Sequence, residues 1–148
     1  MEVHRRSFRG TPASVPAARH FIREALRHPG GVDCPQAEMV ELACSEFVTN
    51  ALHHTPSGNG GTITVAITHQ PGFIRLEVDD AGSAVPPLRP VVPDEFAESS
   101  RGLMIVNSIA TRWGDDGVHG PIERDSGGIA GWHRAWAEFD CPVTAIQR

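Results

Sequence analysis

The most informative segment of the chain reads Glu46-Phe47-Val48-Thr49-Asn50-Ala51-Leu52-His53-His54. A carboxylate, a carboxamide and an imidazole follow one another every fourth residue, and residues four apart share one face of a helix. Glu46, Asn50 and His54 therefore form a polar stripe. The adjacent face is apolar, as a helix packed on a core requires, and it consists of Val40, Cys44, Phe47, Val48 and Ala51. Such a stripe is either an ordinary solvated face or a source of oxygen ligands for a hard cation such as Mg²⁺.

Two later segments favour the second interpretation. Residues 73–78 alternate apolar and polar side chains, which is typical of a half-buried strand, and they lead into Asp79-Asp80-Ala81-Gly82. Residues 99–106 place a turn of small residues before the apolar start of a helix. The N–H groups at such a helix start point toward an anion, and the positive end of the helix dipole attracts it. These segments therefore add an anion site to the carboxylate and amide of the first helix.

The order of the three segments resembles the GHKL (Bergerat-fold) ATP-binding family, which includes histidine kinases, gyrase and the anti-sigma-factor kinases. Glu46, Asn50 and His54 resemble its N box. The resemblance implies that Glu46 is a catalytic base and that Asn50 binds Mg²⁺. For His54 three interpretations stay open: a phosphate contact, a cation at the helix C-terminus, or a residue that faces a partner.

The other two segments resemble the glycine boxes of the same family. Asp80 and Gly82 resemble the start of the G1 box, which implies that Asp80 accepts a hydrogen bond from the adenine amino group; a plain turn residue is the alternative, because Asp favours turns. Residues 100–103 resemble the G2 box, which implies that the nucleotide contacts Ser100, Arg101, Gly102 and Leu103. Arg101 would either bind a phosphate through two hydrogen bonds or be solvated.

Two glycines of the family's lid are replaced, one by Ala84 and one by Ser100. Glycine reaches backbone conformations that other residues avoid, and in the family it lets the lid close over the phosphates. The resemblance implies ATP-dependent serine/threonine phosphorylation of a protein partner, with ATP and Mg²⁺ as cofactors. Because of the two replacements, the alternative is a non-catalytic module that senses ATP or ADP and binds a regulatory protein.

Within the family, the chain is similar to the small anti-sigma-factor kinases, through Trp113-Gly114 and the closing segment 135–139. This similarity implies an anti-anti-sigma-factor-like (STAS) domain as partner, a sigma factor as a further candidate partner and a homodimer as a candidate assembly. A detached histidine-kinase catalytic domain is disfavoured, because no dimerisation helix with a phospho-accepting histidine is recognised. A purely structural α/β domain is also disfavoured, because the occurrence of the three box-like segments in the family's order would then be a coincidence.

The expected fold is a single α/β domain over residues 1–148, a two-layer sandwich with a mixed, mostly antiparallel sheet and helices on one face. Strands are predicted over residues 3–8, 62–68, 73–78, from Trp113 onward and 132–139. Helices are predicted over residues 15–27, from about 35 to before Pro56, and 103–110. Ser14 is expected to cap the first helix, residues 70–72 to form a hairpin turn, residues 83–99 to form a proline-rich lid, and residues 115–128 to be a glycine-rich excursion.

The composition excludes several other classes of protein. The net charge of −5 argues against binding to a nucleic-acid phosphate backbone. The chain contains no lysine, so all 13 basic residues are arginine. A P-loop and a eukaryotic-type protein kinase both require a lysine, and both are excluded.

The positions of the cysteines and histidines indicate the cellular compartment of the protein and whether it has a zinc site. Cys34, Cys44 and Cys141 are far apart without a Cys-x-x-Cys motif, so unpaired thiols in a reducing cytoplasm are expected. The chain has 8 histidines, but no Cys/His pair has zinc-ligand spacing, so no zinc site is predicted. No apolar run reaches about 18 residues and no signal peptide is recognised, which predicts a soluble, cytoplasmic protein without a membrane segment.

Overall fold

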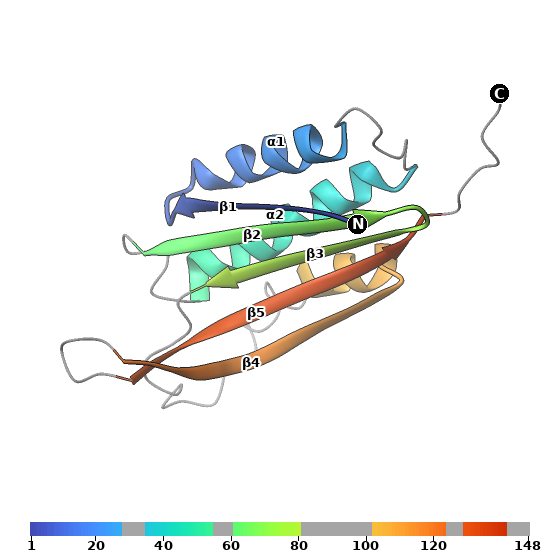
Figure 1. Ribbon diagram of the computed structural model, residues 1–148. Coiled ribbons are helices and arrows are strands. Elements are labelled where there is room, and N and C mark those ends of the chain that lie inside the picture. Colours follow the sequence, from blue (N-terminus) through green and yellow to red (C-terminus); the bar gives the residue numbers. More distant parts are fainter. Residues whose placement is uncertain (28–34, 55–60, 81–101, 124–128, 142–148) are drawn as a thin grey trace, which may run out of the picture.

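The computed structural model describes residues 1–27, 35–54, 61–80, 102–123 and 129–141. A five-stranded sheet has the order β1-β2-β3-β5-β4 (Figure 1). Its strands are β1 (Glu2–Arg9), β2 (Thr62–Gln70), β3 (Phe73–Asp80), β4 (Arg112–Glu123) and β5 (Ile129–Asp140). All four pairings of these strands are antiparallel. The predicted α/β sandwich with a mostly antiparallel sheet is therefore confirmed.

The helices form the second layer of the sandwich. Helix α1 (Ser14–Leu26) packs on β1 and β2, and α2 (Ala37–His54) packs on α1, β3 and β5. A third helix covers residues 102–109. The predicted apolar face of α2 is buried, since Val40, Cys44 and Val48 have no exposed surface. Burying a large apolar side chain stabilises a protein by about 1.5–3 kcal/mol. The apolar face therefore contributes most of the free energy that attaches α2 to the sheet.

Alternation along the strands decides which face of the sheet meets the helices. In β3, Ile74, Leu76, Val78 and Asp80 are buried, whereas the residues between them are only partly buried. In β2, Ile63, Val65, Ile67 and His69 form the corresponding buried row, although Ala66 on the other face is buried as well. Successive strand side chains point to opposite faces, so these two rows lie on the helix side of the sheet.

The opposite face of the sheet carries a lattice of ion pairs. Arg134 contacts Asp79 at 2.8 Å and Glu77 at 2.8 Å. Glu138 accepts from Arg75 at 2.9 Å and from Arg112 at 2.9 Å, and these arginines lower the pKa of Glu138. Charged cross-strand pairs of this kind suit a sheet face that meets solvent.

Two predicted turns have different outcomes. The hairpin turn between β2 and β3 is confirmed, and Gly72 adopts a φ of 86°, which glycine reaches without steric cost. The prediction that Ser14 caps α1 is wrong: the capping position is Ala13, and Ser14 is the first helical residue. The chain already turns before Ser14, whose hydroxyl donates backward to the carbonyl oxygen of Thr11 at 2.6 Å.

The predicted glycine-rich excursion at residues 115–128 is wrong for most of its length. Strand β4 continues to Glu123, and β5 begins at Ile129, so the two form a long hairpin. The register shifts between Asp116 and Val118 and again between His119 and Ile122. Glycine and proline are tolerated at such irregularities, which is why this composition does not end the strand.

The cysteines differ from one another. Cys44 is a free, fully buried thiol, and burial raises its pKa to about 12. Cys141 is disulfide-bonded, so the prediction of unpaired thiols is wrong for this residue; its sulfur pairs by proximity in space, which spacing along the chain does not reveal. None of the helices in the described part of the chain is long and apolar enough to cross a membrane.

Candidate nucleotide site

The structure brings together three of the predicted site residues, Glu46, Asn50 and Gly102. Glu46 and Asn50 lie one turn apart on α2, each partly buried. Gly102, the first residue of the 102–109 helix, lies against both. A Cβ added at Gly102 would be 2.7 Å from Glu46 Oε2 and 3.7 Å from Asn50 Oδ1. A side chain at this position would push the Glu46 carboxylate away, so glycine lets the start of the helix approach it this closely.

The helix that starts at Gly102 is held firmly in the fold. Val106 is fully buried in the core, and Leu103 packs against it. The indole of Trp113 in β4 donates to Asn107 Oδ1 at 2.9 Å. The backbone N–H of Thr111 donates to the Glu138 carbonyl oxygen at 2.9 Å. These contacts fix the start of the helix, with its N–H groups, beside the two oxygen-bearing side chains of α2.

Asp80 is the last residue of β3 and belongs to the buried row that faces the helices, with 6% of its surface exposed. On the neighbouring strand β5, His133 is its direct partner in the register. His133 Nδ1 lies 3.1 Å from Asp80 Oδ2, while His133 Nε2 contacts Asp115 of β4. The hydrogen bonds to Asp115 and then to Asp80 raise the pKa of His133 to about 10.

His133 is therefore an imidazolium between two carboxylates at neutral pH. A cation beside a buried carboxylate offsets the cost of removing that carboxylate from water. An ionised carboxylate has about four acceptor positions, so pairing with His133 leaves Asp80 further capacity to accept hydrogen bonds. Sequence reasoning missed His133, because its partnership with Asp80 depends on the register between β3 and β5.

The family model described as "Histidine kinase-like ATPase domain" matches residues 8–116. The chain belongs to the histidine kinase-like ATPase family. Membership implies ATP binding, and the matched range contains α2, Asp80 and Gly102. His133 lies beyond the matched residues. The predicted GHKL resemblance is thus confirmed at the level of the family.

One curated relative of this histidine kinase-like ATPase domain is an uncharacterized protein of Streptomyces coelicolor, identical at 38% of positions over 71 residues. The match spans 47% of this chain and 66% of the relative. The name of that relative assigns no activity.

Several predicted residues of the ATPase domain lie outside the described residues. These are Gly82, Ala84, Ser100 and Arg101, together with the predicted lid at 83–99. His54 is the last residue of α2, and its side chain is likewise outside what the structure describes. Their predicted roles stay predictions.

Proposed function

We propose that the protein is an ATP-dependent serine/threonine protein kinase of the anti-sigma-factor type, which regulates transcription through protein partners. The contact of Gly102 with Glu46 and Asn50 carries the proposal, because Gly102 starts the helix that would face the phosphates. A carboxylate able to act as a base and an amide able to bind a cation therefore lie at the anion-attracting end of a helix.

Asn50 is the proposed Mg²⁺ ligand. Carboxylate and amide oxygens are hard donors that suit Mg²⁺, which otherwise keeps several of its waters. Gly102 lies close to both Asn50 Oδ1 and Glu46 Oε2, so the start of its helix and these two oxygens are brought together. When bound, the ion neutralises charge on the transferring phosphoryl group.

Glu46 is the proposed base for phosphoryl transfer. The hydroxyl oxygen of the substrate serine or threonine bonds to the γ-phosphorus of ATP, and the bond from that phosphorus to the bridging oxygen breaks. ADP leaves with the electron pair of that bond, and Glu46 takes the hydroxyl proton. The position of the Glu46 carboxylate against Gly102 gives the proton a defined acceptor beside the helix start.

Asp80 is the proposed acceptor for the adenine amino group. It is a buried carboxylate on the helix side of the sheet, and α2 packs on the same strand. The imidazolium of His133 keeps a positive charge next to it. Gly102 is a further proposed nucleotide contact, supported by its position against Glu46 and Asn50. The remaining proposed nucleotide contacts rest on the resemblance alone and are His54, Gly82, Ser100, Arg101 and Leu103.

The proposed substrate is an anti-anti-sigma-factor-like (STAS) domain, with a sigma factor as second partner and a homodimer as the assembly. The test is transfer of labelled γ-phosphate from ATP to a panel of STAS domains. Glu46→Gln keeps the shape of the side chain but removes its basicity, so transfer should fall by about 10²–10⁴-fold while ATP still binds. Glu38→Gln is the matched control, since Glu38 is a residue in the first turn of the same helix. Transfer at the parent rate in Glu46→Gln would remove Glu46 from the chemistry.

A non-catalytic ATP/ADP sensor is the second candidate, favoured by Ala84 and Ser100 in place of two lid glycines. A lid that closes poorly would retain nucleotide binding and lose turnover. This candidate predicts no transfer to any STAS domain, together with a partner affinity that differs between the ATP- and ADP-bound forms. Calorimetry with ATP and ADP, with and without Mg²⁺, followed by partner titration, separates the two functions.

A further inference from the structure

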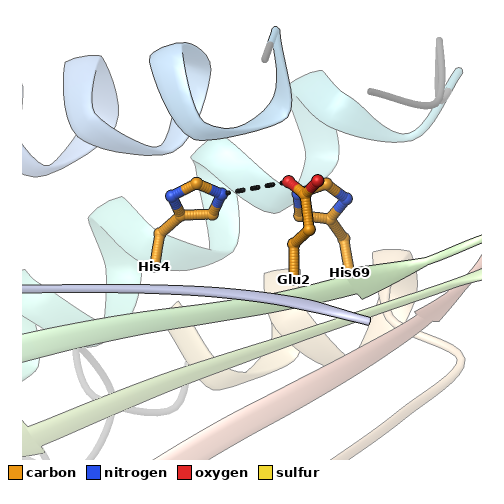
Figure 2. Close-up of side chains that lie close together, drawn as sticks. All are labelled: Glu2, His4 and His69. Atoms are coloured by element: carbon orange, nitrogen blue, oxygen red, sulfur yellow. Dashed lines mark ion pairs between the residues drawn. The ribbon is translucent and has the colours of Figure 1, made fainter. Parts of the chain in front are cut away.

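A second group of polar side chains lies on the other strand pair of the sheet. Glu2 and His4 of β1 and His69 of β2 converge on the side of the sheet that faces the helices (Figure 2). Glu2 is directly opposite His69 in the register, and His4 is two residues further along β1 on the same face. The pairing of β1 with β2 therefore brings the three side chains together.

Two separations between the three groups match the edges of a metal coordination shell. Glu2 Oε2 lies 3.5 Å from His4 Nε2 and 3.3 Å from His69 Nε2. One ligand atom from each residue lies within 4.8 Å of the others. Zinc bonds to nitrogen and oxygen of about 2.0–2.2 Å place neighbouring tetrahedral ligands about 3.3–3.6 Å apart. The two carboxylate–imidazole separations fall in this range.

The surroundings also favour a metal over a surface ion pair. The His69 side chain is 6% exposed, and it continues the buried row of β2. The two imidazole rings are nearly parallel, at 5°, with centroids 5.6 Å apart. Two ring nitrogens from neighbouring strands thus approach one carboxylate oxygen. A single cation placed between them could be coordinated by all three side chains.

We propose that Glu2, His4 and His69 form a binding site for a divalent zinc ion, with the remaining coordination position filled by water. The site joins the outermost strand β1 to β2, so the ion would fasten the edge of the sheet. The absence of Cys/His spacing in the sequence does not argue against it, because the ligands meet through strand pairing. This proposal replaces the prediction, made from the spacing of cysteines and histidines, that the chain has no zinc site.

The proposed zinc site is separate from the nucleotide site. His69 lies beside the turn that joins β2 to β3, whereas Asp80 lies at the opposite end of β3. Zinc binding and ATP binding are therefore expected to be independent, so the failure of one proposal would leave the other standing. The site also needs neither the predicted lid nor any other residue outside the described part of the chain.

Zinc binding can be tested with the full chain after removal of any affinity tag and any bound metal. Titration with ZnCl₂ in competition with a chromophoric chelator should give one ion per chain. Saturation should raise the melting temperature by about 5–10 °C at a hundredfold excess of free Zn²⁺ over the dissociation constant. Substitution by Co²⁺ should give the visible spectrum of a low-coordinate nitrogen–oxygen site without a sulfur-to-metal band.

Variants decide whether these three residues are the ligands. His4→Ala and Glu2→Gln change residues that are partly or largely exposed, and each should weaken zinc binding at least about tenfold, since even outer partners of ligands cost about 10–100-fold. His20→Ala is the matched control, because His20 is an exposed histidine of α1. Circular dichroism and ATP affinity confirm that each variant is folded. Equal zinc affinity in His4→Ala, Glu2→Gln and the parent, or no stoichiometric binding at all, would overturn the site and leave an ion pair only.

Discussion

Replacement of Gly102 by alanine should disturb the proposed nucleotide site while leaving the stability of the fold almost unchanged. The new Cβ would be 2.7 Å from Glu46 Oε2, and ordinary van der Waals contact begins at 3.4 Å. The carboxylate therefore has to retreat by about 0.7 Å. Because it is the far end of a flexible side chain, it can do so by leaving its preferred rotamer, at about 0.5–1.5 kcal/mol. Alanine recovers up to about 1 kcal/mol in helix propensity, so the free energy of unfolding should stay within about 1 kcal/mol of the parent.

The effect on chemistry should be much larger than the effect on stability. A misplacement of about 1 Å can cost about 10²-fold in rate, because the reacting groups lose their alignment. Phosphate transfer from labelled ATP should therefore fall by one to two orders of magnitude in Gly102→Ala, while the urea unfolding curve hardly moves. ATP affinity measured by calorimetry in the presence of Mg²⁺ shows whether the variant still binds its nucleotide.

Gly114→Ala is the contrast, because the same chemical change there meets a rigid partner. Its Cβ would be 2.6 Å from Trp136 Nε1 and 2.7 Å from two carbons of the indole ring. Overpacking of this kind costs about 1–3 kcal/mol of stability. If Gly102→Ala is destabilised as much as Gly114→Ala, or transfers phosphate at the parent rate, the argument from Glu46 displacement is refuted.

Three further predictions address single side chains. Asp80→Ala should weaken ATP binding by about 1–3 kcal/mol, because the adenine amino group loses its acceptor, whereas Asp79→Ala, on the opposite face of β3, should not; unchanged affinity in Asp80→Ala would reject the adenine role. Asn50→Ala should abolish the Mg²⁺ dependence of ATP binding seen in calorimetry, and an undiminished Mg²⁺ effect would exclude it as a ligand. The raised pKa of His133, about 10 against an ordinary 6.5, stabilises the fold fully below pH 6.5 and loses that contribution as the pH rises toward 10. Urea unfolding from pH 6 to 10 should therefore show a steeper loss of stability in the parent than in His133→Gln. The other histidines, the thiols and the N-terminal amine also titrate in this range, but both proteins contain them, so the difference between the two curves reports His133. Parallel curves would contradict the assignment.

Local periodicity accounts for most of the correct sequence predictions. The stripe of Glu46 and Asn50 lies on one helix, so its geometry follows from a period of 3.6 residues. The alternation in β3 likewise puts Asp80 in the same row as Ile74, Leu76 and Val78, and this row is the buried one. The order of segments that the family shares likewise predicted Gly102 as a site residue, although not its contact with Glu46. Such features depend on residues near one another in sequence or on an order of elements common to the family.

Features that depend on strand register could not be predicted. His133 becomes the partner of Asp80 only through the pairing of β3 with β5. The approach of His69 to Glu2 follows from the pairing of β1 with β2. A shift of one residue would turn each of these side chains to the opposite face of the sheet. Neither histidine has a local sequence signal that distinguishes it from the other histidines of the chain.

Asp80 does not act alone, because its negative charge is paired with His133, which is in turn bonded to Asp115. A buried carboxylate alone is costly, and a buried pair often recovers its desolvation cost only when the geometry and further hydrogen bonds are good. His133 supplies the positive charge, and Asp115 holds the second ring nitrogen, so the imidazole is fixed from both sides. Loss of Asp115 should therefore loosen His133 and, through it, the orientation of Asp80. In this protein the proposed recognition of adenine thus depends on three strands, β3, β4 and β5, and not only on the strand that ends in Asp80.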